Sequence, residues 1–247
     1  MDYGKAVSFV FNDKNWIGVI LVGGALGLVG LLFFWTLIIP ILAIAALLGY
    51  MMQLIRDVRL NPDAGLPAWT DWGKKLSDGL KLMIVSLIWA IPLFLLIMPI
   101  IFFIVLAAAY SDSNALSLIA AIVSLAAGML ATLYGLLLVF LQPAFTINLA
   151  VRDEFSAGLD VGAIFKITRA HFVDILIILI LIWGISYIAS YVGILIFLIG
   201  VFFTSFWVML VRGHLFGQLA RLALPVEKPE DVQAIVPTET QSISVTE

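Results

Sequence analysis

Five basic side chains in this sequence have the chemistry to bind an anion. Arginine can hold a phosphate or a carboxylate through two parallel hydrogen bonds, and cationic side chains at the ends of apolar helices commonly meet lipid headgroups. One arginine and the only deep histidine lie well inside the last apolar segment, where an arginine must reach the surface or find a partner. The candidate contacts for an anionic lipid or ligand are Arg56, Arg152, Arg212, His214 and Arg221.

These residues allow two interpretations. Arg56, Arg152 and Arg221 end successive apolar segments, so they could anchor helix ends at the headgroups without specificity. Alternatively, the three segments converge and the three arginines share one anion pocket. His214 could approach a large flat cofactor because Gly213 and Gly217 flank it, but a packed, hydrogen-bonded histidine is favoured and no cofactor is expected.

The acidic residues between the second and third apolar segments offer little for catalysis. Asp63, Asp71 and Asp78 are mixed with Lys74 and Lys75, a pattern typical of the solvated face of a helix. The sequence has no cysteine, no His-Glu zinc motif, no glycine-rich phosphate loop and no serine nucleophile elbow. We therefore expect no metal site and no enzymatic activity.

The composition places these residues in a membrane protein. Hydrophobic residues make up 63% of the 247 and charged residues only 12%, whereas a soluble domain is about half apolar and a quarter charged. The mean hydropathy is +1.16. A net charge of -3 with no strongly basic face gives no reason to expect a nucleic-acid partner.

The apolar segments predict six transmembrane helices. Residues 17–55 contain no charged side chain, and one helix of that length would measure about 58 Å, roughly twice the hydrocarbon thickness. Two spans with a reversal near residues 30–36 are therefore expected. A third span covers residues 81–110, tilted or kinked at Pro92 and Pro99. A turn at residues 111–114 and a fourth span to about residue 150 follow, and residues 174–211 form two more spans that divide near residues 191–193.

The basic residues set the orientation. All 13 lysines and arginines fall at one end of the predicted spans, and the positive-inside rule makes that end cytoplasmic, with both termini there. No cleavable signal peptide is expected, because Asp2, Lys5, Asp13 and Lys14 interrupt the first fifteen residues.

The spans also look like three copies of one unit. Each copy begins with a short amphipathic stretch, polar on one side, that would lie in the headgroup plane as an interfacial helix and lead into a helical hairpin. The approximate repeats cover residues 2–57, 67–153 and 160–222 of a single transmembrane domain, residues 1–223, and a polar acidic C-terminal tail, residues 224–247, follows. The predicted fold class is all-α, a polytopic membrane bundle of six helices in three hairpins.

Four short motifs carry a family resemblance: Gly49-Tyr50 followed by Arg56, residues 66–73 (Leu-Pro-Ala-Trp-Thr-Asp-Trp-Gly), residues 78–80 (Asp-Gly-Leu) and residues 214–218 (His-Leu-Phe-Gly-Gln). With these motifs the chain resembles the prokaryotic membrane family catalogued as domain of unknown function 4013, over roughly residues 5–222. The resemblance implies a six-helix domain in a bacterial or archaeal cell membrane, and it supplies no activity and no catalytic residue.

Two stripes of small residues allow close approach of helices, one at Gly18, Gly23 and Gly27 and the other at Ser124, Gly128 and Thr132. Packing inside the bundle is the favoured interpretation of both, and a surface for a partner subunit is the alternative. The middles of the spans lack the ionisable groups typical of ion-coupled transporters.

These features favour a non-enzymatic membrane protein that acts as an accessory, scaffold or assembly subunit of a larger membrane complex. The alternative is a carrier or binder of a lipid or other amphipathic solute at the cytoplasmic leaflet, in a pocket near Arg212 and His214. A lipid-processing enzyme is a weaker third possibility, because it would need acids or histidines clustered at the headgroup level. The expected partners are the bilayer, anionic lipid headgroups and other membrane subunits.

Overall fold

The computed structural model describes residues 1–110, 113–196 and 198–225, and no strand occurs among them. In chain order the elements are α1 (Tyr3–Asn12), α2 (Trp16–Leu32), η1 (Phe34–Thr36), α3 (Ile38–Leu60), α4 (Trp72–Ala109), α5 (Asn114–Arg152), η2 (Phe155–Leu159), α6 (Val161–Ala170), α7 (Phe172–Leu195) and α8 (Gly200–Ala223). The two η elements are short 3-10 helices. The predicted all-α class is confirmed.

Five helices, α3, α4, α5, α7 and α8, are long and apolar enough to cross a membrane. A sixth crossing is counted if α1 and α2 are taken together, although they meet at a bend of 98°. The arrangement of six spans in three hairpins therefore stays a prediction. The predicted tail falls largely on residues 226–247, which lie outside the described residues.

The second amphipathic stretch differs from the prediction, because it is not a separate interfacial helix. Its residues from Trp72 onward form the first turns of α4 and continue without a break into the apolar part. Within α4 no proline occurs before Pro92, so no residue in its first turns removes a backbone hydrogen bond. By contrast, α1 and α6 both end before the long helix that follows them.

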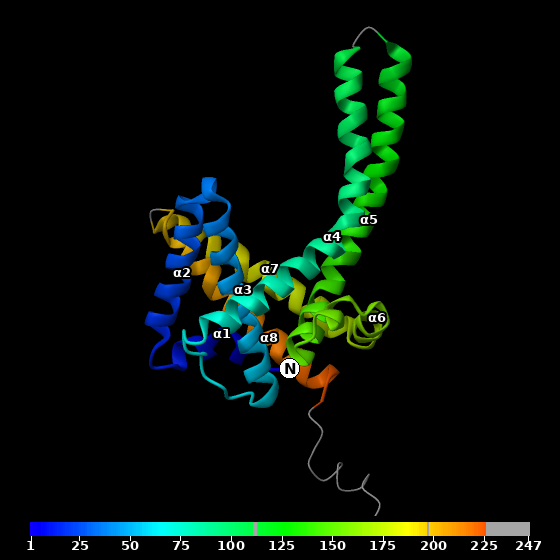
Figure 1. Cartoon of the computed structure of the whole chain (residues 1–247). Coiled ribbons are helices and arrows are strands. Elements are labelled where there is room, and N and C mark those ends of the chain that lie inside the picture. Colours follow the sequence, from blue (N-terminus) through cyan, green and yellow to red (C-terminus); the bar gives the residue numbers. More distant parts are fainter. Residues whose placement is uncertain (111–112, 197, 226–247) are drawn as a thin grey trace, which may run out of the picture.

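The last two long helices divide later than expected, between Leu195 and Gly200 rather than near residues 191–193. Pro92 and Pro99 lie within α4 and Pro143 within α5 without ending either helix. Both helices bend along their length, as predicted for α4, and their outer halves form an arm that projects beyond the tips of α2, α3, α7 and α8 (Figure 1).

Helix α3 is the centre of the remaining body, since it packs against α2, α4 and α8 and touches α5. Its contact with α4 is so close that only glycine fits on both sides. A Cβ atom at Gly49 would lie 1.8 Å from the carbonyl oxygen of Lys75, and one at Gly79 would lie 1.8 Å from that of Ala45. Two glycines thus let the backbones of α3 and α4 touch.

The glycine contact predicts the effect of adding one methyl group. Gly49→Ala and Gly79→Ala should each lower the free energy of unfolding by about 3 kcal/mol, the upper end of the usual overpacking cost, because the new Cβ meets backbone that cannot rotate away. Thermal unfolding of the purified protein in detergent measures the change.

Gly184→Ala in α7 is the matched control, because a Cβ there has no neighbour within 4 Å. Alanine is favoured over glycine in a helix by roughly 0.5–1 kcal/mol, so this variant should be neutral or slightly more stable. Equal melting temperatures for all three variants would contradict the close contact.

Candidate functional site

The structure places a buried ion pair where the sequence predicted a solvated face. Asp78 on α4 is 1% exposed, and its carboxylate accepts a hydrogen bond from Arg56 Nη2 at 2.5 Å. Arg56 Nη1 also donates to the carbonyl oxygen of Ala150 near the end of α5, at 3.4 Å. The expectation that Asp78 is solvated was wrong, because the glycine contact draws the first turns of α4 onto α3.

A second carboxylate extends this network to the solvent. Asp153, just after α5, accepts hydrogen bonds from Lys74 Nζ at 2.7 Å and from Lys81 Nζ at 3.1 Å. The hydrogen bond from Lys74 is the largest cause, and together with Lys81 it lowers the pKa of Asp153 to about 2. The ion pairs therefore stabilise the fold at neutral pH and are lost only as the pH falls from about 4, the usual range of an aspartate, towards 2.

The three candidate arginines differ in their surroundings. The Arg56 guanidinium is occupied by Asp78 and Ala150, whereas Arg152 and Arg221 are exposed. Arg221 lines a different hollow of about 280 Å³, together with Asp2 and Lys5 of the N-terminal segment. The shared anion pocket stays a prediction.

His214 is fully buried and holds the N-terminus in place. Its Nδ1 lies 3.0 Å from Nε2 of Gln218, and the ring of Phe9 packs on its ring with 4.3 Å between centroids. Gln218 in turn exchanges two hydrogen bonds with the backbone of Asp2, at 2.7 and 2.9 Å. Arg212, half-buried on the same helix, has no hydrogen-bonding or ionic partner in the part of the chain that the structure describes.

The histidine near α6 makes only a local contact. His171 Nδ1 lies 3.4 Å from Asp174 Oδ2, three residues on. Among the described residues no group of three or more histidines and acids could hold a metal ion. The His171–Asp174 pair joins the residue between α6 and α7 to the first turn of α7.

The motif residues pack around Tyr50 on α3. The Tyr50 hydroxyl donates to the carbonyl oxygen of Pro67 at 2.7 Å, and its ring packs on Trp69 with 4.4 Å between centroids. Trp69 Nε1 donates to the carbonyl oxygen of Val19 on α2 at 3.3 Å, and Lys75 Nζ donates to the carbonyl oxygen of Thr70 at 2.5 Å. These contacts hold the 61–71 segment against α2 and α3, so the motif residues stabilise the fold.

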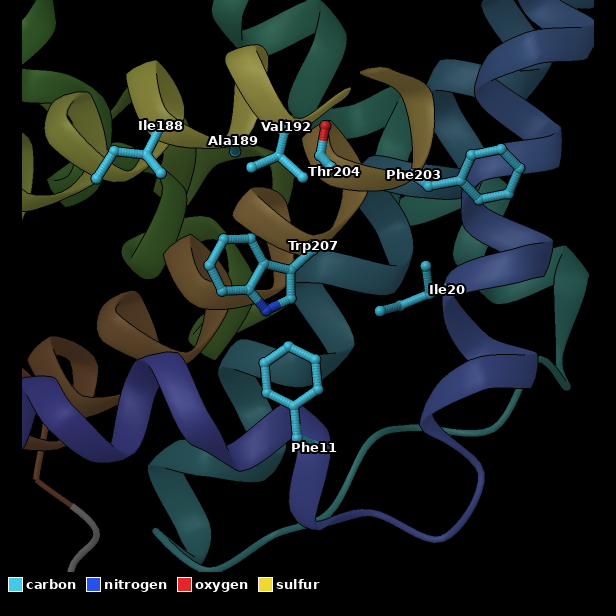
Figure 2. Close-up of a pocket in the computed structure, with 8 residues that line it drawn as sticks. All are labelled: Phe11, Ile20, Ile188, Ala189, Val192, Phe203, Thr204 and Trp207. Carbon is cyan, nitrogen blue, oxygen red and sulfur yellow. The ribbon is translucent and has the colours of Figure 1, made fainter. Parts of the chain in front are cut away.

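An apolar groove lies away from all these polar groups, between α1 and α2 on one side and α7 and α8 on the other. It encloses about 340 Å³. Figure 2 shows Trp207 at its centre, with Phe11 of α1 on one side of the indole and Val192 of α7 on the other. The groove is lined by Phe11, Ile20, Ile188, Ala189, Val192, Phe203, Thr204 and Trp207. This groove could not be predicted from the sequence, since no local pattern links residues this far apart.

The two small-residue stripes have different surroundings. A Cβ at Gly23 or at its neighbour Gly24 would clash with the ring of Phe206 or Phe203 on α8, so this part of the first stripe packs inside the bundle, whereas a Cβ at Gly18 would have no neighbour within 4 Å. A Cβ at Gly128 would have no neighbour within 4 Å. The second stripe, Ser124, Gly128 and Thr132, instead lines a surface hollow of about 520 Å³ on the arm.

Helices this long and apolar, packed through glycine contacts with their polar network at one end, define a multi-pass helical membrane protein. The chain belongs to the family described as protein of unknown function, DUF4013, whose model matches residues 31–198, about two thirds of the sequence. The suspected family is thus confirmed. The match includes the motifs around Tyr50 and Asp78 and ends before His214. No curated protein matches the chain, and no solved structure matches it.

The buried ion pair predicts a large loss of stability on removal of one partner. Asp78→Asn should lower the free energy of unfolding by about 3–5 kcal/mol, because the Arg56 guanidinium would keep its partly buried place without a counter-charge. Urea unfolding in detergent micelles measures the change. Asp63→Asn is the control, since this side chain is 79% exposed in its ion pair with Lys5 and solvent screens that pair, so the substitution should leave the stability almost unchanged.

A double substitution separates the ion pair from other effects at Asp78. Adding Arg56→Gln to Asp78→Asn should cost much less than the sum of the two single changes, because neither charge is then left alone. Additive losses would show that Arg56 and Asp78 do not interact in the folded protein.

Proposed function

We propose that the chain crosses a prokaryotic plasma membrane six times, with both termini in the cytoplasm. The proposal counts α1 as an interfacial helix and α2 as a span, and it pairs α2 with α3, α4 with α5, and α7 with α8 as three related hairpins. Each of these pairs is in contact. The polar network of Arg56, Lys74 and Lys81 gathers at the end of the body where the positive-inside rule places the cytoplasm.

We further propose that the protein is a non-enzymatic accessory, scaffold or assembly subunit of a larger membrane complex. The observation that carries this proposal is the arm of α4 and α5. None of the residues in the most apolar 18-residue stretch of α4 is buried, whereas half of the corresponding stretch of α3 is. The helices α4 and α5, with 38 and 39 residues, would each extend about 57 Å, roughly twice the hydrocarbon thickness.

The second small-residue stripe gives the arm a surface for another helix. The Ser124 hydroxyl is buried and has no hydrogen-bond partner among residues 1–110, 113–196 and 198–225. Leu125, Met129 and Leu133 are each more than 60% exposed beside it. Small residues four apart let helices approach closely in a membrane. A transmembrane helix of a partner subunit suits this surface.

The topology can be mapped directly because the sequence has no cysteine. In intact cells, a membrane-impermeant maleimide should label Thr36→Cys and Asn114→Cys, which lie at the ends of hairpins opposite to the basic residues. Asn15→Cys and Ser156→Cys should react only after the membrane is broken, because they lie at the basic end. Labelling of all four in intact cells, or the reverse pattern, would contradict the proposed orientation.

A bulky residue on the second stripe should release the partner. In Gly128→Leu the amount of partner protein that copurifies in mild detergent should fall at least about tenfold, the effect of losing roughly 1.4 kcal/mol of close packing. Gly184→Leu in α7 is the matched control and should copurify the wild-type amount, since its Cβ also has open space.

A photoreactive residue at Leu125 should crosslink the same partner in native membranes, whereas one at Ile180, an equally lipid-exposed position on α7, should not. A monodisperse lone monomer that crosslinks only lipid from Leu125 would overturn the proposal of a subunit role.

A further inference from the structure

The apolar groove has no polar group to offer a ligand. Of its eight lining residues only Thr204 and Trp207 carry polar side-chain atoms. The Thr204 hydroxyl donates to the carbonyl oxygen of Val201 at 3.2 Å, and the Trp207 indole nitrogen is buried out of reach of a molecule in the groove. The walls are therefore hydrocarbon, which excludes a polar solute because its hydrogen bonds would go unmet.

The groove opens sideways from the bundle. Ile188 is 65% exposed, Phe11 is 51% exposed and Val192 is 46% exposed, so its rim faces outward from α1 and α7. In a membrane these positions meet lipid hydrocarbon rather than water. If the groove stayed empty, the side chains that line it would lose van der Waals contacts.

The size of the groove distinguishes a lipid chain from a partner helix. An α-helix with side chains is about 10 Å wide and rises 1.5 Å per residue, so about 340 Å³ would hold roughly three residues of it. A volume in the range of small-molecule sites, about 300–1,000 Å³, instead suits a narrow flexible chain. Trp207 and Phe11 supply flat aromatic walls that such a chain can follow (Figure 2).

We infer that this groove binds one hydrocarbon chain of a membrane lipid. The chain enters beside Phe11, at the end of amphipathic α1, and runs past Trp207 towards Val192 and Phe203 near the α7–α8 turn. Hydrogen bonds between Asp2 and Gln218 hold α1 along α8, so the wall that carries Phe11 is in place before the lipid arrives. This site lies apart from Arg212 and His214, where the sequence had placed a lipid pocket, and it does not depend on the subunit role.

Native mass spectrometry of the full chain tests the inference. After purification from membranes in a mild detergent and washing, the wild-type protein should carry about one lipid per chain, identified by its mass. Ala189→Phe fills the groove from its buried wall, and Val192→Phe fills it from its exposed rim. Both should retain about one tenth of the lipid or less, because the loss of only two buried methylene groups lowers affinity roughly tenfold.

Ala126→Phe is the matched control, because Ala126 is exposed on the arm far along the chain from the groove and should leave the lipid content unchanged. Val192→Phe guards against misfolding of the buried variant, since Val192 lies at the exposed rim of the groove rather than in the packed interior, and its melting temperature should equal that of the control.

Three results would overturn the inference. These are a wild-type protein that carries only detergent, groove variants that keep the wild-type amount of lipid, and an equal loss of lipid in Ala126→Phe. Rebinding of a synthetic phospholipid added to stripped wild-type protein, but not to Val192→Phe, would support it. Copurification of protein partners is a separate measurement, so the groove and the subunit role can fail independently.

Discussion

The direct contact between the backbones of α3 and α4 determines most of what surrounds it. Gly49 and Gly79 remove the side chains that would hold these helices apart, and the first turns of α4 are drawn onto α3 as a result. Asp78 is thereby buried beside Arg56, whose second nitrogen reaches α5. On its other side α3 meets α8, where a Cβ at Gly217 would clash with Val58. One helix with glycine contacts on two sides thus organises the body, and the polar groups follow from its packing.

The sequence was sufficient for features that depend on local pattern. Uninterrupted apolar length gave the all-α membrane class, and the reversal predicted near residues 30–36 is where α2 ends and η1 leads into α3. Features that depend on packing could not be predicted from the sequence. Asp63 and Asp78 lie in similar mixtures of charge, yet one is 79% exposed and the other 1%. What separates them is the close packing of α4 on α3, where Gly49 lies against the backbone of Lys75, a contact that a scan along the chain does not reveal.

The two small-residue stripes show the same limit for the candidate site. Both satisfy the spacing that permits close helix packing, but Gly23 and Gly24 face phenylalanine rings of α8 while Gly128 faces open space. Spacing indicates that a surface can be approached and does not identify what approaches it. The apolar groove is the extreme case, because its walls come from four helices separated by most of the sequence. The five basic candidates were recognisable by residue type alone, but residue type does not predict which partners each one meets, such as Asp78 for Arg56 and Gln218 for His214.

The structure divides its interactions between two regions with different physical rules. Hydrogen bonds and ion pairs of Asp78, Asp153 and Gln218 fasten the end that carries the basic residues. Beyond that end, lipid hydrocarbon is as apolar as the side chains it meets, so burying more leucine or isoleucine gives no driving force for association. Specificity in the apolar region must then come from shape. The hollow at Gly128 has the shape to let a helix backbone come close. The groove at Trp207 is a narrow space that the side chains around it leave unfilled. The two proposed ligands, a partner helix and a lipid chain, therefore suit surfaces of different shape, although both surfaces are lined mainly by carbon.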